Sequence, residues 1–276
     1  MAKSNKGVTV VTSTFRQSLI QNVFHNYVRQ AWRKKELIVV INKDDISINK
    51  YRDWARRFPN VTVYKLPEKK NLGSCLNYAV ERAKYAHVAK FDDDDYYGPN
   101  YLTEAMNVFR RTNADVVGKH GFFFYFPHKS VLLQRKTWLK PNSRCRKVAG
   151  ATIMLNKRIF GKVKFATNLR SGSDRRFLND CVKKGCRIHT SSPYNFAAIR
   201  RENPYSHTWK VSEKTLFGGK NVAVFGTNDF RSYVNKPIKP VTGTRPTSAK
   251  PTGAKPSNIK LQLHPSPYLD LTQYGT

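Results

Sequence analysis

The sequence predicts a single α/β domain with a mostly parallel sheet and helices on both faces, followed by a basic Pro/Lys-rich tail. Segments typical of strands and of helices alternate four times within residues 7–110, which is the pattern of a right-handed parallel α/β sheet. The uninterrupted aliphatic run Glu36–Asn42 (ELIVVIN) is typical of a strand buried on both faces. From Asn235 onward Pro, Lys, Thr and Gly predominate, so we expect a disordered or surface-packed tail there.

Local patterns predict the elements of the first half one by one. The apolar run Val8–Val11 predicts the first strand. The helix after it is marked by apolar residues spaced three and four apart, namely Ile20, Val23, Phe24, Tyr27, Val28 and Ala31. After the strand Glu36–Asn42, the predicted elements are a helix containing Ile48, Tyr51, Trp54 and Phe58, a strand at Val61–Leu66, a helix at Ser74–Lys84, a strand at Val88–Phe91 and a helix that begins at Pro99.

The second half has a different pattern. Asp115–Gln134 is rich in β-forming residues and contains turn residues, which predicts hairpin-like strands. Gly150–Asn156 (GATIMLN) predicts another buried strand, and Asp174–Lys184 predicts a helix. Beyond Trp209 the periodicity fades, so we expect the folded domain to end near that residue.

The chain is strongly basic, with 50 Lys+Arg against 18 Asp+Glu and a formal net charge of +32. Such a charge is compatible with binding to nucleic acid, to anionic membrane surfaces or to acidic polymers. The sequence contains no zinc-finger, aromatic RNA-binding or basic leucine-zipper pattern. No motif therefore indicates nucleic-acid binding, which stays open as an alternative class of function.

Two further patterns concern location and redox state. No apolar run reaches the roughly 18 to 20 residues that cross a bilayer, and no apolar secretion segment follows Met1. We therefore expect a cytoplasmic protein. The four cysteines lack zinc-like spacing and are expected to be free thiols: Cys75, Cys145, Cys181 and Cys186.

Four consecutive aspartates, Asp92–Asp95, lie between the predicted strand Val88–Phe91 and the helix at Pro99. Adjacent carboxylates repel one another, so a bare cluster is costly unless a cation lies among them. Open α/β sheets bind ligands at the carboxyl ends of their strands, and these aspartates are at such an end. A divalent-metal site is therefore the hypothesis, and a solvated acidic loop is the alternative.

Six motifs occur in a specific order over residues 7–209, namely VTVVTSTFR, ELIVVINKDD, NLGSCLNYAVERA, AKFDDDDYYGPNYL, GATIMLNKRIF and RSGSDRRFL. This order resembles a family 2 glycosyltransferase with a GT-A fold. The resemblance implies a transferase domain at 1–209, with a nucleotide-binding half at 7–110 and an acceptor half at 111–209, and an extension at 210–276. Within the family it is similar to the bacterial spore-surface or envelope glycan type, which implies a peripheral position at a membrane or spore surface as an alternative location.

The resemblance assigns roles to the aspartates. Asp92, Asp93 and Asp94 fill the family's DxD element in the nucleotide-sugar site. This implies that Asp94 binds Mn²⁺ or Mg²⁺ and that Asp92 contacts ribose or metal-bound water; such hard cations prefer oxygen ligands. In the segment YSHTW, His207 is implied as a further metal ligand, with an ordinary polar surface residue as the alternative.

Further donor contacts are implied at the ends of the first three strands. Thr12 is implied to contact the base on one side and the turn with Asn42 and Asp44 on the other, while Lys70 and Asn71 are implied to contact phosphate or ribose. The family commonly has a carboxylate where Asn42 stands. Because an amide both donates and accepts hydrogen bonds whereas a carboxylate only accepts, the identity of the base is open.

Asp174 is implied as the catalytic base. The family usually has Glu-Asp at this point, and this chain has Ser-Asp. Three nearby arginines could keep the carboxylate ionised: Arg170, Arg175 and Arg176. The alternative is that Asp174 only caps its helix, and the next candidates for the base are then Asp115 and Glu202.

Together these assignments imply a hexosyltransferase-like enzyme that is metal-dependent and inverting. The expected donor is a nucleotide sugar, foremost a UDP-sugar, and the acceptor is a hydroxyl group of a glycan, protein or envelope component. The basic tail is expected to bind an anionic surface. Two alternatives stay open: a basic polyanion- or nucleic-acid-binding protein with a vestigial transferase fold, and a metal-dependent nuclease or phosphatase. The sequence has no GxSxG, GxxxxGK[ST] or HExxH motif, which leaves serine-hydrolase, P-loop and zinc-protease functions without support.

Overall fold

The computed structural model describes residues 6–203 and 209–238. The chain divides into two units, Met1–Pro240 and Val241–Thr276, and the fold below is that of the first unit. The predicted tail, apart from its first residues, lies outside the described residues, as does His207.

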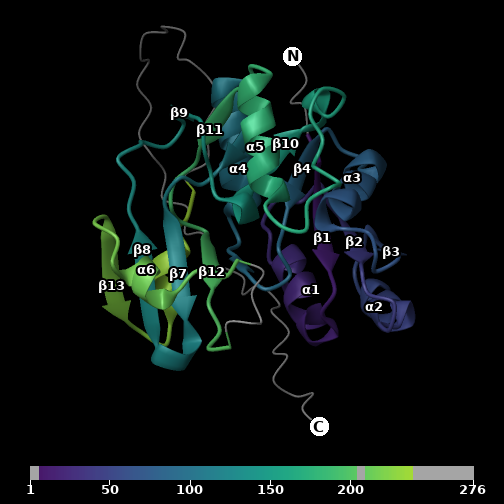
Figure 1. Ribbon diagram of the computed structural model, residues 1–276, viewed down its shortest axis with the longest axis horizontal. Coiled ribbons are helices and arrows are strands. Elements are labelled where there is room, and N and C mark those ends of the chain that lie inside the picture. Colours follow the sequence, from purple (N-terminus) through teal and green to yellow (C-terminus); the bar gives the residue numbers. More distant parts are fainter. Residues whose placement is uncertain (1–5, 204–208, 239–276) are drawn as a thin grey trace, which may run out of the picture. The chain divides into compact units, whose positions relative to one another are not determined.

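Within the described residues, eight strands form a mixed sheet whose order is β3-β2-β1-β4-β10-β6-β11-β9 (Figure 1). The four strands β3, β2, β1 and β4 are parallel neighbours, as are β6 and β11, whereas β10 runs antiparallel to both β4 and β6. The bounds are β1 Val8–Thr14, β2 Lys35–Ile41, β3 Val61–Lys65, β4 His87–Lys90, β6 Val116–Gly118, β9 Arg144–Cys145, β10 Met154–Asn156 and β11 Ile188–Thr190.

Helices cover both faces of this sheet because successive side chains of each strand point to opposite faces. In β2, Leu37 and Val39 belong to a core cluster that also holds buried residues of α1, α2 and α4. Ile38 and Val40 belong to a second cluster, shared with α3 and α5. The helices are α1 Ile20–Val28, α2 Ile48–Ala55, α3 Leu72–Arg82, α4 Tyr101–Thr112 and α5 Ser173–Lys183. The predicted α/β class, with helices on both faces, is confirmed.

A second sheet, ordered β13-β8-β7-β12-β5, lies beside the first (Figure 1). Its strand β5 begins directly after Asp95, and the aspartates form the turn between β4 and β5. The two sheets therefore meet near the aspartates. One face packs into the core that holds α4, and the other is covered by α7. The bounds are β5 Tyr96–Tyr97, β7 Phe122–Phe126, β8 Val131–Arg135, β12 Phe196–Ile199, β13 Val222–Gly226, α6 Glu213–Phe217 and α7 Phe230–Val234; the 3-10 turns are η1 Gln17–Leu19, η2 Pro127–Lys129, η3 Gly150–Thr152 and η4 Lys157–Ile159.

The structure differs from the sequence predictions in three places. The first unit continues past Trp209, because β13 pairs with β8 and completes the second sheet. The predicted strand Gly150–Asn156 begins as a 3-10 turn and is a strand only at its end. Within Asp115–Gln134 the hairpin of β7 and β8 is confirmed, but β6 joins the first sheet. The first and third differences arise from long-range strand pairing, which local patterns do not report.

Among the described residues, no helix combines the length and the apolar character that a membrane crossing requires.

Candidate active site

The predicted donor-site residues come together because of the parallel strands. The aspartates follow β4, Asn42 follows β2 and Lys70 follows β3. Arg16, which was not predicted, follows β1. Since β1 to β4 are parallel, their carboxyl ends meet at one edge of the sheet. The candidate active site is therefore at this edge, where the two sheets also meet.

The four aspartates alternate between inward and outward positions. The side chains of Asp92 and Asp94 are 32% and 15% exposed, whereas Asp93 and Asp95 are buried. The carboxylates of Asp93 and Asp95 thus point into the protein, and those of Asp92 and Asp94 point outward from the turn. The outward pair is the first and third residue of the element that the sequence predicts as DxD.

Asp93 is bound by β1 and the residues after it. The hydroxyl of Thr14 donates to Asp93 Oδ2 at 2.6 Å, and Nε of Arg16 donates to the same oxygen at 3.2 Å. The guanidinium of Arg16 also lies 3.0 Å from Asp94 Oδ2. Burial raises the pKa of Asp93, and Arg16 opposes that rise. The carboxylate of Asp93 is thus bound by Thr14 and Arg16 inside the protein. Its predicted role in donor binding stays a prediction.

Asp95 and the backbone of the turn are bound by α1 and β12. Asp95 Oδ1 accepts a hydrogen bond of 3.1 Å from the Ile199 amide. Two asparagines of α1 donate to main-chain carbonyls: Asn22 to Asp93 and Asp95 at 2.7 and 2.9 Å, and Asn26 to Asp95 at 2.8 Å. These bonds fix the turn, so the outward side chains have a defined direction.

Lys90, the last residue of β4, joins the two predicted parts of the site. Its side chain is 2% exposed, and Nζ lies 2.5 Å from Asp92 Oδ1 and 3.1 Å from Asp174 Oδ2. Burial alone would lower the pKa of Lys90, but Asp174 and Asp92 hold it above its ordinary value. Lys90 is not among the residues predicted from the sequence. A lysine inside the apolar strand HVAKF was the available signal, because a charge in a buried strand requires a buried partner.

Asp174 lies in the first turn of α5 but does not cap it. The N-cap position is Gly172, with a φ of 79° and no side-chain cap. Among the described residues, Asp174 Oδ1 is buried and has no hydrogen-bond partner. Burial raises the pKa of Asp174, Lys90 opposes the rise, and Asp92 adds to it. A carboxylate with a raised pKa and a free acceptor atom is suited to taking up a proton.

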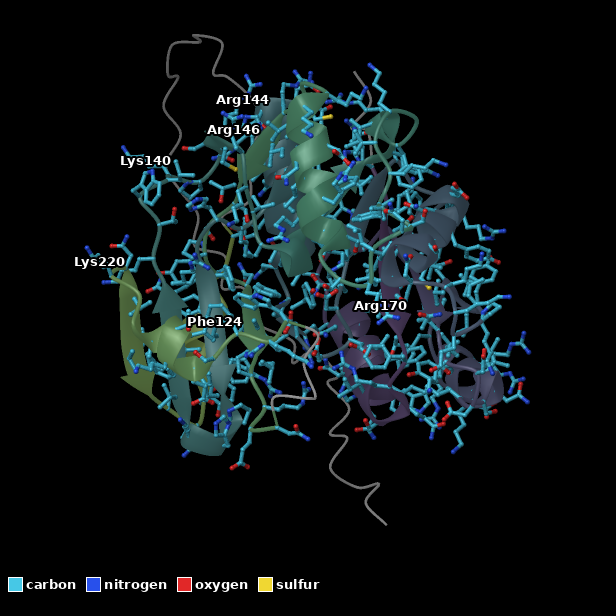
Figure 2. The ribbon with its side chains drawn as sticks, viewed as in Figure 1. Phe124, Lys140, Arg144, Arg146, Arg170 and Lys220 are labelled. Atoms are coloured by element: carbon cyan, nitrogen blue, oxygen red, sulfur yellow. The ribbon has the colours of Figure 1, made fainter. Side chains whose placement is uncertain are left out.

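The cation that pairs with Asp174 is thus a lysine rather than one of the expected arginines. Arg176 instead pairs with Asp180 at 2.8 Å. Arg170 is exposed in the loop that leads into α5, where Figure 2 labels it. Of the other predicted bases, Asp115 is bound by Arg158 and Arg187. Its carbonyl pairs with Asn156, which lies opposite His87 at the far end of β4, so Asp115 is remote from the aspartates.

Gly150 allows Asp174 to approach. A Cβ atom at Gly150 would lie 2.6 Å from Asp174 Oδ2 and 2.7 Å from its Cβ, which is closer than van der Waals contact permits. The Gly150 carbonyl also accepts a 3.4 Å hydrogen bond from Lys90 Nζ. The sequence GATIMLN predicted a strand here, and the structural need for its glycine was not visible in that pattern.

The segment before α5 is fixed to α3. Asn77 exchanges two hydrogen bonds with the backbone of Phe165, at 2.8 and 2.9 Å. Asn71 caps α3 by accepting from the Ser74 amide at 2.9 Å, and its side-chain amide donates to the Thr167 carbonyl. A Cβ at Gly73 would lie 1.9 Å from the carbonyl oxygen of Ala166. Asn71, predicted to contact the donor, therefore also anchors the segment that leads to Asp174.

The remaining predicted residues occupy neighbouring positions on the same edge. Thr12 is buried in β1. Asn42 donates to the Pro67 carbonyl at 2.9 Å, and Asp44 Oδ1 accepts from the Glu68 amide at 3.0 Å. Lys70 is exposed. Their contacts with a donor stay predictions.

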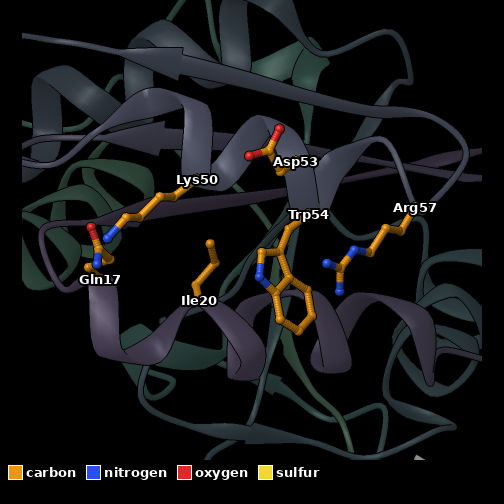
Figure 3. Close-up of a pocket in the computed structure, with 6 residues that line it drawn as sticks. All are labelled: Gln17, Ile20, Lys50, Asp53, Trp54 and Arg57. Atoms are coloured by element: carbon orange, nitrogen blue, oxygen red, sulfur yellow. The ribbon is translucent and has the colours of Figure 1, made fainter. Parts of the chain in front are cut away.

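A hollow of about 280 Å³ lies between η1, α1 and α2 (Figure 3). Six residues line it: Gln17, Ile20, Lys50, Asp53, Trp54 and Arg57. None of the predicted site residues is among them. We therefore place the candidate active site at the aspartates and not at this hollow.

The outward carboxylates fit a hard divalent cation. Asp92 and Asp94 present oxygen donors, which Mg²⁺ and Mn²⁺ prefer. The described residues contain no cluster of three or more His, Cys, Asp or Glu side chains that could hold a metal alone.

Comparison with known proteins identifies the family. The sequence model of the glycosyl transferase family 2 matches residues 9–201. The chain belongs to this family. The match includes the aspartates, Lys90 and Asp174. No curated protein matched the sequence.

Solved structures of glycosyltransferases share the fold of this chain. S. aureus TarS 1-349 in complex with UDP-GlcNAc is 17% identical, with a TM-score of 0.58 over 77% of this chain and 64% of that chain. The mannosyltransferase PcManGT from Pyrobaculum calidifontis, in complex with GDP-Man and Mn²⁺, is 19% identical, with a TM-score of 0.53 over 72% of this chain and 57% of that chain. This family 2 chain thus matches less than two thirds of the length of either structure. The spore or envelope type stays a prediction.

Proposed function

We propose that the protein transfers a sugar from a nucleotide-sugar donor to an acceptor hydroxyl, with inversion at the anomeric carbon and with a divalent metal. The observation that carries this proposal is the position of Lys90 between Asp92 and Asp174. Through it, an aspartate of the DxD element and a carboxylate from a distant helix face the same edge of the sheet. A nucleotide sugar and an acceptor can meet there.

Asp174 acts as the general base in this proposal. Its Oδ2 is bound by Lys90, while its Oδ1 has no hydrogen-bond partner among the described residues. Oδ1 can therefore accept the proton of the acceptor hydroxyl as the acceptor oxygen attacks the anomeric carbon. A single displacement of this kind inverts the configuration.

Positive side chains assist the departure of the nucleoside diphosphate. Arg16 lies 3.0 Å from Asp94 Oδ2, and Arg201 lies 4.0 Å from the same oxygen. Both guanidinium groups are near enough to stabilise negative charge that develops on the leaving group. A metal held by Asp94, with Asp92 beside it, would supply further positive charge to the diphosphate.

The donor is expected to be a UDP-sugar. TarS binds UDP-GlcNAc and PcManGT binds GDP-Man, according to their structures. Nucleotide sugars are therefore the first ligands to test, and the choice between bases is a part of the experiment.

The test is a thermal-shift panel of UDP, GDP and their sugar derivatives, with Mn²⁺ and with excess chelator. A ligand at 100 times its dissociation constant should stabilise the protein by about 2.7 kcal/mol. We expect this shift only with metal, and we expect Asp94→Ala to abolish it. The matched control is Asp53→Ala, which removes an exposed aspartate paired with Arg56 on α2.

Three outcomes would count against the proposal. Equal nucleotide binding with excess chelator would reject the metal at Asp94. Degradation of oligonucleotides with Mg²⁺ alone would favour the nuclease. Polyanion binding without any nucleotide-dependent shift would favour a vestigial transferase fold.

A further inference from the structure

The segment Arg135–Lys147 forms an exposed basic surface. Between Asp115 and Asp174 the sequence contains no acidic residue. The side chains that we group as the basic surface are all exposed: Arg135, Lys136, Lys140, Arg144, Arg146, Lys147, Lys220 and the aromatic Trp138. Figure 2 labels Lys140, Arg144, Arg146 and Lys220, which lie along the same side of the molecule.

Several contacts bring these residues together. The Lys136 amide donates to the Asn221 carbonyl at 2.8 Å, which places Lys220 beside the segment. Trp138 packs edge-on against His120, with ring centroids 5.3 Å apart. Burial lowers the pKa of His120, and Arg135 and Lys147 lower it further, so both cations lie near that ring. Near the C-terminal end of the segment, Arg144 of β9 lies opposite His189 of β11 in the sheet.

The cations of the basic surface form no ion pairs within the described residues, unlike several other cations of the stretch between Asp115 and Asp174. Four of those others pair with acids from distant segments: Lys119 with Glu104, Lys129 with Glu213, Arg158 with Asp115 and Lys164 with Glu81. Within residues 6–203 and 209–238, every ion pair uses a cation outside the basic surface. The surface therefore carries positive charge that the described fold does not neutralise, which favours an anionic ligand.

The basic surface leads to the candidate active site. Two residues, Val148 and Ala149, separate Lys147 from Gly150, so the two positions are at most about 11 Å apart. The intervening Ala149 amide donates to the Lys119 carbonyl at 2.8 Å, and Val148 is buried. Gly150 in turn contacts Asp174. A chain molecule bound along the surface would thus reach the predicted base.

We propose that the basic surface binds an anionic glycan chain and presents its hydroxyl groups to Asp174. This inference rests on the proposed function, because it names the acceptor of that same reaction. Phosphate or carboxylate groups of the glycan would contact the cations. The flat face of Trp138, which is 78% exposed, offers a sugar ring a surface on which to pack.

Two other polyanions fit the surface less well. Insertion into a membrane requires a set of apolar side chains, and Trp138 is the one exposed large hydrophobic residue of Arg135–Lys147. Single-stranded nucleic acid is bound by stacking successive bases on several aromatic rings, and this segment contains one. A glycan needs only the charges and a single ring.

The test measures binding of the full chain to dextran sulfate, uncharged dextran, polyphosphate, single-stranded DNA and phosphatidylserine vesicles in about 0.1 M salt. The variant Lys140→Glu/Arg144→Glu/Arg146→Glu reverses three charges of the surface. The control Arg33→Glu/Lys34→Glu/Lys50→Glu reverses three exposed charges elsewhere, so both proteins have the same net charge. We expect at least a tenfold weaker affinity for dextran sulfate in the first and less than a threefold change in the second, with a flatter salt dependence in the first.

Trp138→Ala separates the sugar from the charge. It should weaken binding to dextran sulfate severalfold and leave binding to polyphosphate unchanged, because polyphosphate has no ring. Equal losses in the two charge-reversal variants would overturn the proposal, as would a loss confined to vesicles or DNA, or a Trp138→Ala protein with unaltered dextran sulfate binding. The nucleotide-dependent thermal shift should survive in both charge-reversal variants. Absence of that shift in the wild type would be the separate failure of the proposed function.

Discussion

The ammonium group of Lys90 lies 3.1 Å from Oδ2 of Asp174, with the lysine side chain only 2% exposed. This ion pair connects the central strand β4 to the first turn of α5. Because Lys90 also contacts Asp92, one residue sets the spacing between the DxD element and the predicted base.

Asp174→Asn should lower the turnover number by about 10²- to 10⁴-fold, the usual contribution of a positioned general base. The amide keeps the size of the carboxylate but cannot take up the proton. Donor binding and melting temperature should stay near those of the wild type. Asp180→Asn on the same helix is the control, and it should keep its activity. Full transfer activity in Asp174→Asn would show that another residue is the base.

Lys90→Met should move the acidic limb of the pH–activity profile to higher pH. The base must be ionised, and burial already raises the pKa of Asp174 while Lys90 opposes that rise. Removing the ammonium leaves the pKa higher still, so activity is lost at a higher pH as the pH falls. Lys90→Arg, which keeps the charge, should leave the limb closer to its original position. A limb that is identical in Lys90→Met would contradict the proposed role of the ion pair.

The same Lys90→Met variant should be destabilised most at neutral pH. A carboxyl group whose pKa is higher in the folded than in the unfolded state favours folding at low pH and opposes it above its folded pKa. The loss of stability relative to the wild type should therefore shrink as the pH is lowered. Urea unfolding at several pH values measures this dependence, and a loss that grows toward acid would contradict it.

Gly150→Ala should reduce turnover by about 10²-fold, because the new Cβ would lie 2.6 to 2.7 Å from atoms of Asp174 and displace its carboxylate. Metal-dependent nucleotide binding should persist. Gly161→Ala is the matched control, since a Cβ at Gly161 has no atom within 4 Å. Steady-state kinetics of the two variants decide the matter: similar rates would mean that the close approach has no bearing on the reaction.

Arg16→Met should destabilise the fold by about 3 to 5 kcal/mol, because it leaves the buried carboxylate of Asp93 without its cation. Lys43→Met removes a pair with Glu68 in which both side chains are partly exposed, and little change is expected from it. Urea unfolding of both variants provides the comparison. An Arg16→Met protein as stable as Lys43→Met would show that Asp93 finds another way to be neutralised.

The sequence predicted the elements of the first half because their patterns are local. The predicted strand Glu36–Asn42 is β2 at Lys35–Ile41, shifted by one residue, and the helix Asp174–Lys184 is α5, shifted in the same way. Periodicity failed at the end of α1, where Val28 is 46% exposed. The helix ends at that residue, so the spacing pattern continued beyond the structure that it predicts.

The candidate site was predicted only in part, for a physical reason. A short motif such as the aspartate run is visible in the sequence, and so is a carboxylate at a helix start. Lys90, Arg16 and Gly150 act through contacts with residues far away in the chain. Such contacts depend on the register of β4 against β1 and β10, which no local pattern specifies.

The four aspartates are chemically identical, but their side chains alternate between outward and buried positions. Asp92→Asn and Asp93→Asn are the same exchange of one oxygen for nitrogen, made one position apart. Because the first side chain faces outward and the second is enclosed with Arg16 and Thr14, the first change should alter catalysis and the second the integrity of the fold. An alignment shifted by one residue along this tract would therefore equate an outward-facing aspartate with an enclosed one, although every letter still matched.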